Sequence, residues 1–172
     1  FIEDKSIDAI ICDLPYGTTA CKWDSILPLD RLWIEYKRVL KDGGCLVFTG
    51  TQPFTTTLIA SNFKMFKYEL IWEKSRASNI FFRNTQPLKY HENILVFCEG
   101  VTTYIPQMRT GFKPYQCKQG KTKSQNYGGQ TGALTISNGE RFPLTVIEFQ
   151  RDKEKVHPTQ KPAALMEYLI RT

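Results

Sequence analysis

The sequence predicts an α/β protein built on a doubly wound sheet, and three observations support this fold class. Apolar runs of strand type alternate along the chain with segments of helical periodicity. The run at 45–49 is apolar throughout, as in a strand that is buried on both faces. The order up to residue 98 is strand, helix, strand, helix, strand, strand, which is typical of an open sheet with helices on both faces.

Proline and glycine mark the ends of the expected elements. Pro15 lacks an N–H and cannot continue a central strand, so the first strand ends before it. Apolar residues at helical spacing predict a helix from 28 or 29 to 40, and we expect Asp42-Gly43-Gly44 to end it with a left-handed glycine cap. The other expected elements are strands at 8–12, 45–49, 68–74 and 92–98, and helices at 54–62 and 163–171.

Two connections have an unusual composition. The stretch 76–90 is aromatic and basic, and burial explains its pair Phe81 and Phe82 at least as well as contact with a base does. The stretch 101–155 is rich in Gly, Gln, Thr, Lys and Tyr, and contains a strand-like run at 144–147. Such a long irregular insertion is expected to be either functional or a solvated, flexible loop. Cations interleaved with aromatic residues suit contacts with phosphates and bases, which makes these residues candidates for DNA binding: Arg109, Lys113, Lys118, Lys121 and Lys123.

The composition limits the class of protein. A chain of 172 residues with 41% hydrophobic residues can form one domain with a real core. A net charge of +6 mildly favours a polyanionic partner. No apolar run reaches the length of a membrane span. Five cysteines without a Cys-x-x-Cys pair, and two separated histidines, argue against a disulfide framework and a metal site, so a reducing cytoplasm is expected.

The segment Asp13-Leu14-Pro15-Tyr16-Gly17 directly follows the first expected strand. Open α/β sheets hold their ligands at the carboxyl ends of strands. A carboxylate and rigid main-chain carbonyls can accept hydrogen bonds from an amine, and a tyrosine ring offers a stacking face. The alternative interpretation is an ordinary turn at the end of a strand.

This segment resembles the Asp-Pro-Pro-Tyr signature of the amino-methylating DNA methyltransferases, which act on adenine N6 or cytosine N4. Leu14 stands in place of the first proline. The stretch 157–162, His-Pro-Thr-Gln-Lys-Pro, is similar to a box that precedes the cofactor-binding region in one permuted group of that family. With the segments between them, the two matches cover nearly the whole chain. The resemblance implies a partial, Rossmann-like methyltransferase fold with an irregular basic insertion.

The resemblance also implies a reaction and its residues. The methyl donor would be S-adenosylmethionine and the substrate double-stranded DNA. Catalytic residues would be Asp13, Leu14, Pro15 and Tyr16, and the cofactor would contact Asp13, Thr159, Gln160 and Lys161, with Lys161 pairing with its carboxylate. Asp as the first residue of the signature favours adenine, whereas the cytosine N4 enzymes more often carry Ser there.

The resemblance further implies a division of the chain. Residues 1–100 would be the catalytic half, 101–155 the target-recognition insertion, and 156–172 the cofactor-side turn and helix. The family's Phe-x-Gly-x-Gly turn is absent, so we expect a fragment, and an exposed apolar edge at 9–12 that pairs with another chain unless a continuation covers it. The resemblance would allow a restriction endonuclease as a further partner, but the sequence does not distinguish a paired enzyme from one that acts alone. A nucleic-acid-binding module without catalysis and a small-molecule α/β enzyme remain the rival interpretations.

Overall fold

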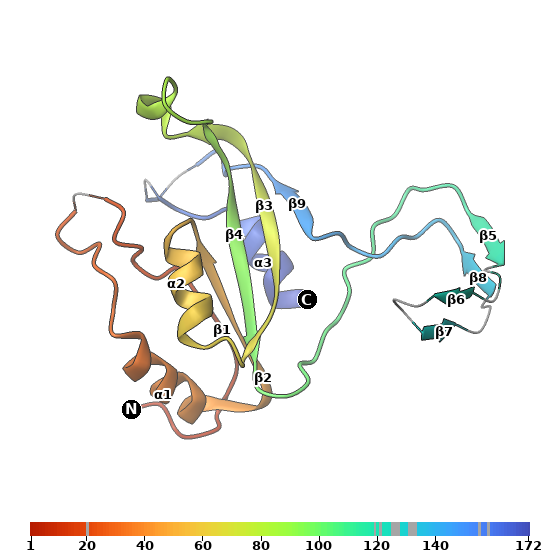
Figure 1. Ribbon diagram of the computed structural model, residues 1–172, viewed down its shortest axis with the longest axis horizontal. Helices are drawn as coiled ribbons and strands as arrows, with labels where there is room; N and C mark the ends of the chain where they lie inside the picture. Colours follow the sequence, from red (N-terminus) through yellow and green to blue (C-terminus); the bar gives the residue numbers. More distant parts are fainter. Residues whose placement is uncertain are drawn as a thin grey trace. The chain divides into compact units, whose positions relative to one another are not determined.

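The computed structural model describes residues 1–19, 21–118, 120, 122–124, 128–130, 134–154, 156–157 and 159–172. The chain divides into two compact units (Figure 1). Unit 1 consists of Phe1–Ile105 together with Thr145–Thr172, and unit 2 is Pro106–Leu144.

Unit 1 is built on a five-stranded mixed sheet. In spatial order its strands are β1 (Ile7–Cys12), β2 (Leu40–Gly50), β4 (Lys89–Cys98), β3 (Phe66–Ser78) and β9 (Val146–Phe149). β1 is parallel to β2, β9 is parallel to β3, and β4 is antiparallel to both of its neighbours. Four strands therefore run in one direction, and their carboxyl ends lie at the same edge of the sheet.

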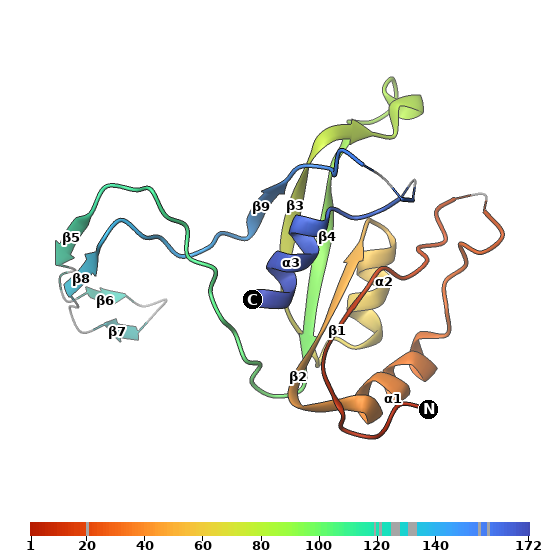
Figure 2. The same ribbon diagram turned by 180° about the vertical axis from the view of Figure 1, so that it is seen from behind.

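Helices cover both faces of this sheet (Figures 1 and 2). α1 (Leu29–Val39) and α2 (Phe54–Ser61) pack on one face, where Trp33 and Leu58 join the larger apolar core. α3 (Ala163–Arg171) packs on the other face through Leu165 and Leu169. The predicted fold class is confirmed.

The end of α1 differs from the prediction. The helix ends at Val39, and Leu40 enters β2 at once because it adopts an extended conformation and pairs with Ile7 of β1. Gly43 is left-handed, with φ of +78°, but it lies in an irregular part of β2 and does not cap the helix. Next to it, a Cβ on Gly44 would lie 2.8 Å from the carbonyl oxygen of Asp8, so the glycine permits a close approach to β1. The predicted glycine cap is wrong.

The structure of the connection between β3 and β4 contradicts one of the two explanations offered for its pair of phenylalanines. β3 extends to Ser78 and is followed by a short 3-10 helix, η1 (Ile80–Phe82). Phe81 and Phe82 are 91% and 52% exposed, so the explanation that this pair is buried is wrong. The strand-like run predicted at 144–147 forms β9 two residues later and completes the sheet beside β3.

Unit 2 contains two short antiparallel pairs, β5 (Tyr115–Lys118) with β8 (Leu134–Ser137) and β6 (Thr122–Ser124) with β7 (Gly128–Gln130). The Arg141 guanidinium lies over the Tyr115 ring, 4.4 Å from its centroid. Across the described parts of both units, no helix combines the length and the apolar character needed to span a membrane.

Candidate active site

A cavity of about 730 Å³ opens at the carboxyl edge of the unit 1 sheet. Its volume is in the range of sites that hold a cofactor or a drug-sized ligand. Its walls come from the segment after β1, the loop that follows it, the facing ends of β3 and β4, and the turn before α3. The lining includes Asp13, Leu14, Pro15, Tyr16, Trp23, Trp72, Lys74, Glu92, Thr159, Gln160 and Lys161.

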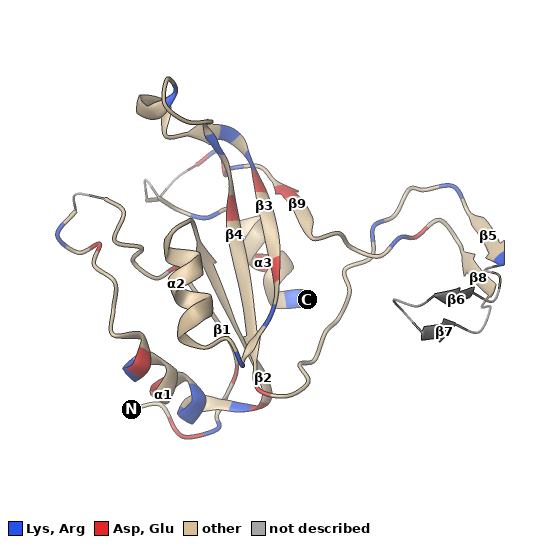
Figure 3. Ribbon diagram, viewed as in Figure 1, with Lys and Arg blue, Asp and Glu red and all other residues tan. Residues whose placement is uncertain are grey.

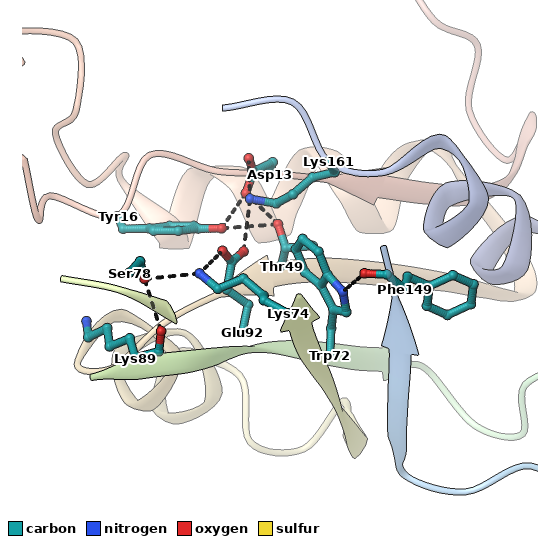
Figure 4. Close-up of polar contacts among 10 residues, drawn as sticks. All are labelled: Asp13, Tyr16, Thr49, Trp72, Lys74, Ser78, Lys89, Glu92, Phe149 and Lys161. Carbon is teal, nitrogen blue, oxygen red and sulfur yellow. Dashed lines mark hydrogen bonds and ion pairs between the residues drawn. The ribbon is translucent and has the colours of Figure 1, made fainter. Parts of the chain in front are cut away.

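Asp13 and Thr49 meet because β1 and β2 are parallel and end together. Cys12 pairs with Phe48, so the next residue of each strand is the polar one. The Thr49 hydroxyl donates a hydrogen bond to Oδ1 of Asp13, and the Tyr16 hydroxyl donates to the same oxygen (Figure 4). Two neutral donors therefore fix the orientation of the carboxylate.

Tyr16 is held in place by its ring as well as by its hydroxyl. The ring stacks on Phe54 with centroids 5.2 Å apart and an interplanar angle of 27°. Burial raises the pKa of Tyr16 well above its usual range, and the charge of Asp13 and the hydrogen bond to it act in the same direction. The phenol therefore stays protonated at neutral pH and remains a donor to Asp13.

The two motifs found in the sequence meet at this carboxylate. Lys161 Nζ lies 3.1 Å from Oδ2 of Asp13, and 5.8 Å from the centroid of the Tyr16 ring. The same ammonium lies 3.0 Å from Oε2 of Glu92. The structure thus brings Asp13, Tyr16 and Lys161 together in one cavity, although they come from opposite ends of the chain.

A second ion pair continues from Glu92 into the sheet. Lys74 Nζ lies 3.1 Å from Oε1 of Glu92 and donates to the Ser78 hydroxyl at 3.2 Å. The Lys74 and Glu92 side chains are only 6% and 13% exposed. Asp13, Lys161, Glu92 and Lys74 form a network of two negative and two positive charges, which is how proteins accommodate ions with little access to water.

The sequence pattern did not identify Thr49, Lys74 or Glu92 as site residues. A signal was present for Thr49, since a polar residue ends an otherwise apolar strand. Trp72 on β3 pairs with Glu92 on the antiparallel strand β4, and Lys74 lies two residues after Trp72. Only this register brings Lys74 and Glu92 together.

Asp24 organises the loop that forms one wall of the cavity. Its carboxylate accepts hydrogen bonds from the N–H groups of Gly17 at 2.9 Å, Thr18 at 3.0 Å and Thr19 at 2.7 Å. The hydrogen bond with the Thr19 side chain, together with these backbone donors, lowers the pKa of Asp24 to about 2. Gly17 has φ of +68°, which is the sharp turn that a glycine at this position predicts.

The turn before α3 holds the other predicted cofactor residues. Gln160 donates to Oδ2 of Asp152 at 2.7 Å, and its side-chain oxygen accepts the N–H of Val156 at 3.0 Å. The Thr159 hydroxyl lies 3.0 Å from Nδ1 of His157. Thr159 and Gln160 line the cavity, and Gln160 also holds the turn in shape. Pro158 of this box lies outside the described residues.

The predicted DNA-binding residues belong to unit 2. Arg109 donates through Nε to the Phe142 carbonyl at 3.1 Å, and its guanidinium lies 5.2 Å from the centroid of the Phe112 ring. Lys113 and Lys118 are exposed. Lys123 lies on β6, and Lys121 lies outside the described residues.

Comparison with known proteins assigns the chain to a family. Residues 7–172 match the family model of the N6/N4 DNA methylases, so the chain belongs to this family of amino-methylating DNA methyltransferases. The Type II methyltransferase M1.MboII of Moraxella bovis is 27% identical over 202 residues, which cover 99% of this chain and 73% of that protein. The family resemblance drawn from the two motifs is confirmed.

Solved structures share the fold. The M1.HpyAVI–SAM complex matches with a TM-score of 0.53 and 22% identity, over 96% of this chain and 66% of that one. The cytosine-N4-specific PvuII DNA methyltransferase matches with a TM-score of 0.59 and 14% identity, over 99% of this chain and 64% of that one. The chain therefore spans about two thirds of the length of these solved proteins.

Proposed function

We propose that this chain carries the catalytic site of a DNA methyltransferase that transfers a methyl group from S-adenosylmethionine to adenine N6. The observation that carries the proposal is the convergence of the two family motifs on one carboxylate, that of Asp13. Asp13 lies in a cavity of suitable size, oriented by Tyr16 and Thr49 and paired with Lys161.

The residues of the cavity fit S-adenosylmethionine. This cofactor carries a positive sulfonium, and the cavity contains two carboxylates, those of Asp13 and Glu92. Its amino-acid end needs polar partners, which Thr159, Gln160 and Lys161 would supply. When bound, the cofactor supplies an electrophilic methyl group.

Asp13 and its neighbours would compensate for the weak nucleophilicity of an exocyclic amine. The lone pair of such an amine is delocalised into the base, and acceptors aimed at its N–H groups make the nitrogen more tetrahedral. Two hydroxyl donors occupy Oδ1 of Asp13, so Oδ2 is the oxygen that would accept an N–H of the target amine. A main-chain carbonyl of Leu14 or Pro15 would accept the other N–H.

Tyr16 would stack on the target base after that base has left the duplex. Phe54 stacks on one face of the Tyr16 ring and the Lys161 ammonium lies 5.8 Å from its centroid, so the base would take the face opposite Phe54. The choice of adenine rests on Asp13 as the first residue of the signature. Cytosine N4 is the second candidate, and mass analysis of the modified nucleoside distinguishes the two.

The remaining parts of the proposal concern the division of the chain, its partners and its location. Residues 1–100 would form the catalytic half, 101–155 the target-recognition insertion on double-stranded DNA, and 156–172 the cofactor-side turn and helix. Self-association through the β1 edge, a restriction endonuclease partner and a cytoplasmic location belong to the same proposal. β1 does lie at one edge of the five-stranded sheet, as this model of association requires.

The test is methyl transfer from a labelled donor to DNA by the full-length protein and its Asp13→Asn variant. We expect the substitution to reduce transfer at least about 100-fold, as the loss of a preorganised polar contact at a reacting centre does. Asp8→Asn is the matched control, because Asp8 lies on β1, the strand that leads to Asp13, is exposed, and pairs only with Lys41 in the contacts described. Methylation retained by Asp13→Asn would reject the proposal, and DNA binding without any product would favour the non-catalytic rival.

A further inference from the structure

The hairpin between β3 and β4 exposes a group of large apolar side chains at its tip. Ile80, Phe81 and Phe82 are consecutive in η1 and are 57%, 91% and 52% exposed. Asn79 precedes them in the left-handed conformation, with φ of +68°, so the chain turns sharply into this tip. Exposed apolar area costs roughly 25 cal/mol per Å², so three adjacent residues of this kind indicate a surface that is covered by a partner.

This tip rises from the edge of the sheet that carries the cavity (Figure 1). Lys74 and Glu92, at the base of the hairpin, line the cavity itself. The stem is held by a chain of hydrogen bonds from Lys74 to the Ser78 hydroxyl, and from that hydroxyl to the Lys89 carbonyl (Figure 4). The five β3 residues Lys74–Ser78 carry the tip away from the cavity by at most about 16 Å, the length of five residues of extended strand.

The charge of the hairpin identifies the chemistry of the partner. Residues 75–90 include Arg76, Arg83 and Lys89 and no acidic residue, as the blue segments of the hairpin show (Figure 3). Cations around an aromatic tip suit a polyanion that also offers flat rings, which is DNA. A second copy of this chain is a poorer partner, because a two-fold contact centred on the tip would bring two sets of these cations together.

We propose that the β3–β4 hairpin is a wedge that inserts Phe81 and Phe82 against the stacked bases beside the target nucleotide, with Arg76 and Arg83 on the phosphates. Apolar side chains inserted at a base step partly unstack the duplex and thereby favour extrusion of the neighbouring base. This inference rests on the proposed function for its substrate, but it concerns DNA binding and not methyl transfer.

The experiment measures binding of the full-length protein to two 30-base-pair duplexes by fluorescence anisotropy. One duplex is fully paired, and the other carries a central adenine opposite an abasic nucleotide, so that this adenine is already unpaired. The variants are Phe81→Ala/Phe82→Ala and the conservative Phe81→Tyr/Phe82→Tyr. Phe63→Ala is the control, because Phe63 is 74% exposed but lies before β3, at the other end of that strand.

We expect the double alanine variant to bind the paired duplex about tenfold or more weakly, by the loss of base stacking. The loss should be smaller on the abasic duplex, where no opening is needed, and the tyrosine variant and the Phe63→Ala control should bind as the unmodified protein does. Unchanged binding of the alanine variant to both duplexes overturns the proposal. An equal loss of affinity for both duplexes in the alanine variant also overturns it. So does an alanine variant that sediments as a monomer where the unmodified protein is a dimer, with its DNA affinity retained. If the hairpin contributes to DNA binding but no methylated product forms, the proposed function fails while this inference stands.

Discussion

Asp13 receives donors from three separate places in the chain. Tyr16 lies in the segment after β1, Thr49 at the end of β2, and Lys161 in the turn before α3. Among the residues that the structure describes, only the Lys161 ammonium contacts Oδ2, the oxygen that the target amine would need. Glu92 offers the same ammonium a second carboxylate at 3.0 Å, so Lys161 can yield its place at Asp13 and remain paired.

The Tyr16 hydroxyl and the Tyr16 ring can be tested separately. Tyr16→Phe removes a hydrogen bond to the charged carboxylate, worth about 1.5–3 kcal/mol, so we expect a loss of methyl transfer of about tenfold or more. Tyr16→Ala also removes the stacking face and should lose a further factor of ten or so, since a stacked base contributes about 1–3 kcal/mol. Equal losses in the two variants would assign the whole effect to the hydroxyl.

The same residue has a defined pH dependence. Because the pKa of Tyr16 in the folded protein lies above its ordinary value of 10, its contribution to stability is complete below pH 10 and declines as the pH rises beyond it. The effect of Tyr16 on the wild-type pH–rate profile should therefore begin only above pH 10. Below pH 10, the profile of Tyr16→Phe should have the same shape as that of the wild type. A limb near neutral pH that disappears in this variant would contradict the assignment.

At the scale of elements, the Lys74–Glu92 pair connects β3 and β4 beneath the cavity. Glu92→Leu leaves the Lys74 ammonium buried without its carboxylate, and we expect a loss of about 3–5 kcal/mol in the free energy of unfolding. Adding Lys74→Met removes the unpaired buried charge and should recover most of this loss. Urea unfolding of the three proteins gives the values. Asp42→Asn, which breaks the exposed Lys5–Asp42 pair, should cost less than about 1 kcal/mol. A double variant as unstable as Glu92→Leu alone would show that packing, and not charge, is responsible.

Elements with strong local signals were predictable from the sequence. α3 occupies the predicted residues because Pro162 sets its start and an apolar stripe faces the sheet. β5 to β8 were not predicted, because three- and four-residue strands in a polar stretch show no alternation. The start of β2 at Leu40 was missed for a different reason: pairing with Ile7 is a long-range contact that local spacing does not reveal.

At the scale of the whole sheet, strand direction assembles the site. Asp13, Thr49 and Lys74 lie near the carboxyl ends of β1, β2 and β3, which run in the same direction. The motifs alone pointed to Asp13, Tyr16 and Lys161, because each belongs to a recognisable sequence pattern. Thr49, Lys74 and Glu92 could be placed only once the strand order β1-β2-β4-β3 was known.

The charge of the molecule as a whole makes a prediction about unit 2. The net charge is +6, and residues 101–139 contain no acidic residue. Arg109 and Arg141 are engaged with aromatic rings and carbonyl groups inside unit 2, whereas Lys113 and Lys118 are exposed. The exposed lysines are therefore the better candidates for phosphate contacts.

Replacing both lysines, Lys113→Gln and Lys118→Gln, should weaken binding to any duplex sequence to a similar degree. Each phosphate contact releases counterions, so the slope of log K against log salt concentration should become shallower by about 2 in the double variant. Lys64→Gln with Lys67→Gln is the control: these two exposed lysines lie before and at the start of β3, at the end of that strand away from the cavity, and should leave the slope unchanged. A titration between low and physiological salt measures both. If the control pair changes the slope as much as Lys113 and Lys118 do, the attraction comes from overall charge, and unit 2 has no particular role in holding the DNA.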